Sequence, residues 1–133
     1  MSRAPNIEKL KKNSDVDGLI KALEYVDLKN LSHAVATIES AAAALGQLRD
    51  DRALAGLLKA LNRLDGLHSE IRGMRDKISF ESGVAMLTAD IEMLTHAIRV
   101  TKTAFLDIVA DRDIEAVTEW ATHHPGEAVP VDR

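Results

Sequence analysis

The apolar positions in the second half of the chain follow a helical spacing. From residue 84 onward they recur at alternating steps of three and four residues, which keeps them on one face of a helix. The members of this row are Val84, Leu87, Ile91, Leu94, Ile98, Thr101, Phe105 and Ile108. The pattern predicts one long helix of about 40 Å with a continuous apolar stripe.

A second row with the same spacing precedes the first. It contains Leu54, Leu57, Leu61, Leu64, His68, Ile71, Arg75 and Ile78. It predicts another long helix over residues 51–78, with a break near Asp65-Gly66 as the alternative, because each mid-helix glycine costs about 1 kcal/mol relative to alanine. Residues 79–83 would then connect the two helices into an antiparallel hairpin, with Ser79 or Ser82 as a capping residue.

The first half contains an internal repeat. Gly18-Leu19-Ile20-Lys21-Ala22-Leu23 returns as Gly56-Leu57-Leu58-Lys59-Ala60-Leu61, 38 residues later from Gly18 to Gly56. Each copy follows acidic residues that suit the start of a helix. The alanine-rich segment 31–48 between the copies predicts a helix with a smooth surface for close packing, and Gly46 is expected near its end in a left-handed conformation.

The segment 43–54, followed by Leu57-Leu58-Lys59-Ala60-Leu61, resembles the HEAT-like repeats first associated with phycobilisome lyases. The resemblance covers about residues 13–62 and implies stacked helix pairs rather than a particular activity. We therefore expect an all-α fold in which a HEAT-like helical repeat pair precedes a long helical hairpin, in an α-solenoid or helical-bundle architecture.

A single domain is expected over residues 1–124. HEAT-like repeats would occupy about residues 4–62, and the heptad-patterned helices with a short last helix would occupy about residues 63–124. That last helix is expected from Asp113 to Thr122. Residues 125–133 are predicted to form a flexible tail.

Composition fits this fold and narrows the partners. Aromatic residues make up only 3% of the chain, which favours helices over strands, and the absence of cysteine fits a reducing compartment. Residues 1–66 hold ten Lys/Arg against nine Asp/Glu, and residues 67–133 hold seven against twelve, so neither half has the dense basic face that nucleic acid requires. No signal peptide and no apolar run of about 20 residues is found. We expect a cytoplasmic protein that binds neither nucleic acid nor membrane.

No catalytic or metal site is predicted. Glu92 with His96, and Glu119 with His123, have the spacing of two ligands on one helix face, but a metal site needs more than two. His68 is expected at a partly wet helix seam rather than in a functional site. The segment 111–122 begins like a calcium loop but has Ala116 and Thr122 at positions six and twelve, so we interpret it as a helix cap. We expect no cofactor and no enzyme; a lyase-like accessory enzyme is the least favoured alternative, and it comes from the resemblance alone.

Four residues are candidates for partner binding. Met86, Met93 and Val100 flank the long stripe at seven-residue intervals, and they are expected either to bury against the first half or to face another chain. Trp120 would be a core anchor or an exposed hot spot. The predicted function is a non-catalytic protein–protein interaction module or scaffold. The alternative is a self-associating subunit that dimerises through the 84–108 stripe, since two repeats are few for a free-standing solenoid.

Overall fold

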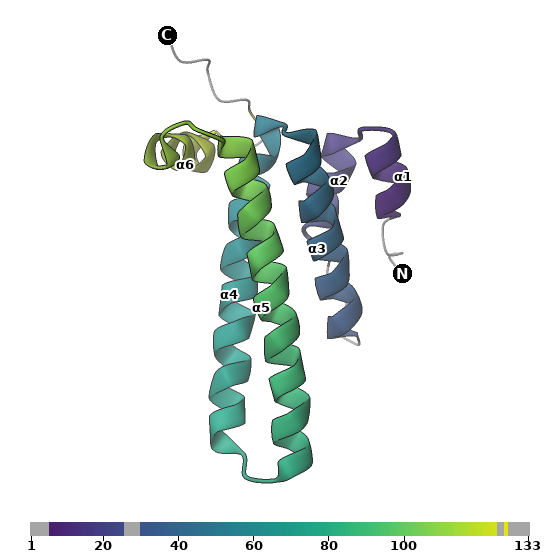
Figure 1. Cartoon of the computed structure of the whole chain (residues 1–133), viewed down its shortest axis with the longest axis vertical. Helices are drawn as coiled ribbons and strands as arrows, with labels where there is room; N and C mark the ends of the chain where they lie inside the picture. The colour runs from purple at the N-terminus through teal and green to yellow at the C-terminus, as the bar shows by residue number, and fades with distance from the viewer. Residues whose placement is uncertain (1–5, 26–29, 125–126, 128–133) are drawn as a thin grey trace.

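The computed structural model describes residues 6–25, 30–124 and 127. Within these residues there are helices and no strands, so the all-α prediction is confirmed. The elements are α1 (Ile7–Lys12), α2 (Val16–Ala22), α3 (Leu31–Leu48), a short 3-10 helix η1 (Asp51–Ala53), α4 (Leu54–Lys77), α5 (Glu81–Val109) and α6 (Ile114–His123). Figure 1 shows α4 and α5 as a long hairpin, with α3 beside α5 and α6 lying across the end where α4 begins. No described helix has the length and apolarity needed to span a bilayer.

The helices form two consecutive pairs. Helix α2 packs on α3, α4 packs on α5, and α3 packs on α5, which joins the pairs. The repeated string begins at the third residue of both α2 and α4, at Gly18 and Gly56. Leu19 and Leu57 are both completely buried. The two copies therefore occupy the same place in their helix pairs, as expected for a helical repeat.

The repeated glycine has a packing reason. A Cβ atom on Gly18 would lie 2.7 Å from Leu10 of α1 and 2.8 Å from the capping carboxylate of Asp15, and one on Gly56 would lie 3.3 Å from Ile20 and from Leu23, at and just after the end of α2. In each copy the glycine leaves room for side chains that precede it in the chain. Helix α1, which the sequence pattern did not predict, packs on α2 and α3.

Gly46 has a different role from the one expected. It lies inside α3, and the left-handed residue at the end of that helix is Arg49, with a φ of 54°. A Cβ atom on Gly46 would lie 2.9 Å from both Cα and Cβ of Ala104 on α5. Gly46 therefore lies near the end of α3 as predicted, but the predicted left-handed conformation was wrong, because Arg49 adopts it and Gly46 serves the contact between the two helices.

Helix α4 is continuous from Leu54 to Lys77, which confirms the predicted long helix, and the alternative of a break near Asp65-Gly66 does not occur. The reason is its seam with α5. Buried residues recur every seven positions along both helices: Leu57, Leu64 and Ile71 on α4, and Leu87, Leu94, Thr101 and Ile108 on α5. Most of the stripe over residues 84–108 is consequently buried within one chain, which leaves little of it for the dimer seam that the sequence suggested.

Three further predictions concern the start of α5, the last helix and the end of the chain. Helix α5 begins after Phe80, without a side-chain cap, so the predicted serine cap is wrong; the Phe80 ring instead lies against Gly83. The last helix is confirmed, with Asp113 accepting hydrogen bonds from the backbone N–H groups of Glu115 and Ala116 at 3.0 and 3.3 Å. The predicted tail, residues 125–133, lies outside the described residues except for Glu127.

Candidate protein-binding surfaces

The distal half of the α4–α5 hairpin projects beyond the rest of the fold (Figure 1). Helix α3 begins at Leu31, and the hydroxyl of Ser32 contacts the sulfur of Met93 at 3.4 Å, which marks where α3 stops covering α5. Beyond this point α4 and α5 are held by each other, through buried Ile71 and Leu87. We call residues 67–93 the hairpin tip.

The hairpin tip carries an unusual share of exposed apolar surface. The large hydrophobic side chains that are most exposed among the described residues are Met74 (53%), Phe80 (61%), Met86 (63%), Leu106 (41%) and Ile114 (49%). Three of these five lie within the tip. Scattered exposed hydrophobic residues are ordinary, but a cluster at one end of a molecule is typical of an interaction surface.

The three stripe candidates fall into two environments. Val100 is half-buried and lines a groove between α3 and α5 together with Gly46 and Ala104, and Met93 is half-buried beside Ser32. Met86, one heptad further towards the tip, lies beyond the start of α3 and is exposed. Two of the three candidates therefore face the first half of the chain, and Met86 alone faces outward.

Trp120 is half-buried on α6. Its indole ring stacks on the ring of His124 with centroids 3.5 Å apart and an interplanar angle of 11°. The indole N–H is buried and has no hydrogen-bond partner among the described residues. The structure thus places Trp120 away from the hairpin tip, and these two regions form no common site.

Two exposed tip residues were not among the sequence candidates. Phe80 lies in the connection between the helices, where no periodic pattern exists, and Met74 lies on α4, where the stripe was assigned to the core. The signal that could have identified them is the length of the hairpin relative to α3, since 24 and 29 residues in α4 and α5 exceed the 18 of α3.

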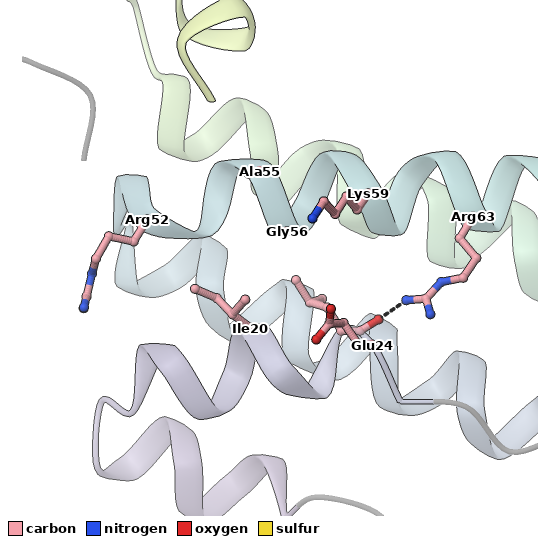
Figure 2. A pocket seen from close by; sticks show the side chains of 8 residues that line it. Ile20, Glu24, Arg52, Ala55, Gly56, Lys59 and Arg63 are labelled. Carbon is pink, nitrogen blue, oxygen red and sulfur yellow. Dashed lines mark hydrogen bonds between the residues drawn. The ribbon is translucent and has the colours of Figure 1, made fainter. Parts of the chain in front are cut away.

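A second surface feature is a groove between α2 and α4, of about 360 Å³. Its floor is apolar and includes Ile20, Ala55 and Gly56, and its rim carries Arg52, Lys59 and Arg63 against the single carboxylate of Glu24. Figure 2 shows Lys59 lying along α4 beside Gly56 and Arg63 extending from α4 towards the segment after α2, where its guanidinium donates a hydrogen bond to the backbone carbonyl of Leu23. We call this feature the α2–α4 groove.

Some of the charged side chains around the groove already form contacts within the chain. The Arg52 guanidinium donates to both carboxylate oxygens of Asp50 at 2.9–3.2 Å, and this contact holds the pKa of Asp50 below its ordinary value. Asp50 also accepts from the backbone N–H of Arg52 at 2.9 Å, which caps η1. Lys59 is exposed and has no side-chain partner in the described part of the chain. Lys59 and Arg63 therefore supply the available positive charge.

The histidines do not gather into a site. His96 lies 3.3 Å from Glu39 of α3, His68 contacts the hydroxyl of Thr95 at 3.1 Å, and the ring of His123 contacts the backbone carbonyl of Glu119 at 2.9 Å. Among the described residues no group of three or more His, Cys, Asp or Glu side chains is placed to hold a metal ion.

Comparison with known families gives one match. A family model described as the PBS lyase HEAT-like repeat matches residues 39–63, which comprise the end of α3, η1 and the first ten residues of α4. This confirms the expected resemblance at the junction between the two helix pairs and supports a helical repeat protein. No curated protein and no solved structure matched the chain.

Proposed function

We propose that this chain is a non-catalytic protein-binding module built on HEAT-like repeats, and that the hairpin tip is its main binding surface. The observation that carries the proposal is the exposure of Met74, Phe80 and Met86 at the end of a hairpin that extends beyond its own repeat. The cytoplasm is the proposed location, since the chain contains no cysteine.

Packing within the chain buries the apolar residues at the base of the hairpin but leaves those at its tip exposed. Near the base, α5 is buried on one side by α4 and on another by α3, and its residues there include the fully buried Leu94 and Thr101. Past Met93, α3 is absent, and Met86 faces solvent. Burying a large apolar side chain contributes roughly 1.5–3 kcal/mol, so three of them give a partner substantial binding energy.

A photo-crosslinking amino acid placed at Met86 in the native host tests this proposal. The matched control carries the same amino acid at Lys102, an exposed position on α5 near the base. We expect one or a few proteins to be crosslinked at position 86 and not at position 102, and we expect Met74→Glu to abolish that product without changing the helical circular dichroism of the protein. The proposal fails if position 86 gives no product above the Lys102 control.

The identity of the crosslinked product distinguishes an interaction module from a self-associating subunit. A product that contains a different protein supports the interaction module. A product that contains two copies of the chain supports the self-association alternative, with the contact between the copies at the hairpin tip instead of along the 84–108 stripe.

A further inference from the structure

Helices α4 and α6 each carry two like charges four residues apart, positive on α4 and negative on α6. Lys59 and Arg63 are four residues apart on α4, and Glu115 and Glu119 are four residues apart on α6. Like charges at this spacing repel each other and destabilise their own helix. The side chains of Lys59, Glu115 and Glu119 have no hydrogen-bond or ion-pair partner among the described residues, whereas Arg63 donates to the backbone carbonyl of Leu23.

Apolar surface accompanies each pair. Lys59 and Arg63 border the α2–α4 groove, whose floor is formed by apolar residues that include Ile20, Ala55 and Gly56. On α6, Ile114 precedes Glu115 and is 49% exposed. The groove, at about 360 Å³, has room for individual side chains but not for a helix, so an isoleucine with two carboxylates beside it matches the groove in size, polarity and charge.

The two pairs cannot meet within one molecule. Figure 1 shows α6 on one side of the α4–α5 hairpin and α2 on the other. From this arrangement we propose that copies of this chain associate head to tail, with Ile114, Glu115 and Glu119 of one copy docking on the α2–α4 groove of the next. Such a contact is heterologous, since it joins two different surfaces and leaves one free groove and one free α6 at the ends of each assembly. It uses neither Met74 nor Met86 and is independent of the proposed function of the tip.

Sedimentation velocity of the full chain tests the proposal. We expect the average mass to rise with protein concentration at about 0.05 M salt and to fall towards the monomer at about 0.5 M, because salt screens the charges at the contact. Lys59→Glu and Glu119→Lys should each weaken association by about tenfold. The matched controls are Lys21→Glu, the equivalent lysine of the first repeat, and Glu92→Lys, an exposed acid on α5; both should associate like the natural protein.

A mixing experiment gives the sharpest outcome. The Lys59→Glu variant retains an intact α6, and the Glu119→Lys variant retains an intact groove. An equimolar mixture should therefore form a 1:1 dimer, in which the α6 of the Lys59→Glu variant docks on the groove of the Glu119→Lys variant, although each variant alone associates weakly. The proposal is overturned if the natural protein remains a monomer up to about millimolar concentration, which excludes a dissociation constant below about 1 mM, if Lys21→Glu weakens association as much as Lys59→Glu, or if the mixture sediments as the sum of two monomers. In that last case an acidic segment of another protein becomes the candidate occupant of the groove.

Discussion

At the scale of single residues, the contact between α3 and α5 depends on the side chain that Gly46 lacks. Gly46→Ala would place a methyl group 2.9 Å from Ala104, which is closer than carbon atoms pack. Overpacking of this kind costs about 1–3 kcal/mol, and the higher helix propensity of alanine recovers about 1 kcal/mol of it. We expect a net loss in the free energy of unfolding, measured by urea titration.

The same chain supplies the control for this substitution. Gly66 lies in the interior of α4, and a Cβ atom there would meet nothing within 4 Å. Gly66→Ala should raise the free energy of unfolding by about 0.5–1 kcal/mol, since only helix propensity changes. Equal stabilisation by both substitutions would show that α3 and α5 do not approach closely at Gly46.

Asp50 makes the stability of the junction depend on pH. Its hydrogen bonds from Arg52 lower its pKa in the folded state, so the ionised carboxylate stabilises the fold above the ordinary value of about 3.9, and this contribution disappears as the pH falls through the folded pKa. Asp50→Asn keeps the oxygen that caps η1 but removes the charge. We expect a loss below about 1 kcal/mol at neutral pH, because the pair is partly exposed.

Urea titrations at two pH values check the result. The difference between the natural protein and Asp50→Asn should be full at neutral pH and smaller near pH 2, because protonation of the folded carboxylate removes its contribution. An equal difference at both pH values would assign the effect to the cap rather than to the charge.

At the scale of elements, the hairpin seam combines one strongly apolar position with one polar position. Leu94 and Thr101 are adjacent seam residues of α5, and both are completely buried. Leu94→Ala leaves a cavity and should lower the free energy of unfolding by about 2–5 kcal/mol. The Thr101 hydroxyl donates to the carbonyl of Ala97 at 2.7 Å, within its own helix, so Thr101→Val should change stability by less than about 1 kcal/mol. A large loss for Thr101→Val would indicate that the hydroxyl serves a partner other than Ala97.

The elements were predictable where periodicity or repetition was strong. The 31–48 helix followed from its alanine content, both long helices followed from apolar spacing, and the repeated string located α2 and the start of α4. The alternative of a break at Asp65-Gly66 does not occur, because the long seam with α5 holds the helix together despite the low helix propensity of glycine. The serine cap was wrong because Phe80 packs on Gly83, a contact that local sequence rules do not include.

The candidate surfaces were harder to predict for a related reason. Whether Met86 is covered depends on where α3 ends relative to α5, and that is a three-dimensional register. Apolar spacing identified Met86 and Met93 as members of one face but could not separate the covered residue from the exposed one. The α2–α4 groove forms where the two repeat copies meet. The repeated string implies that the copies meet, but it does not say which charged side chains line the groove between them.

At the scale of the whole molecule, one ion pair ties the end of the hairpin to its beginning. The Arg112 guanidinium donates to both carboxylate oxygens of Asp51 at 2.8 and 3.0 Å, across 61 residues of sequence, and this contact raises the pKa of Arg112. The same side chain also donates to the carbonyls of Ile108 and Val109 near the end of α5. Arg112 thus connects η1, α5 and the approach to α6.

A double-mutant cycle measures this connection. Arg112→Met and Asp51→Asn should each lower the free energy of unfolding by about 1–3 kcal/mol, and the double variant should lose less than the sum by about 1 kcal/mol. Arg99→Met, at an exposed position on α5, should stay within about 0.5 kcal/mol of the natural protein. Strictly additive losses would mean that Arg112 acts through the α5 carbonyls and not through Asp51.

The unequal lengths of α3 and the hairpin also define how the molecule opens. Near Leu94 three helices share the core, whereas towards Phe80 two helices hold only each other. Thermal fluctuations should therefore unzip the hairpin from its closed end while its base stays intact, and the backbone amides of α4 and α5 should exchange hydrogen for deuterium progressively faster from base to tip. The proposed binding surface would then belong to the least cooperative part of the chain, and a partner that binds it would slow exchange most strongly there, while it also stabilises the whole fold.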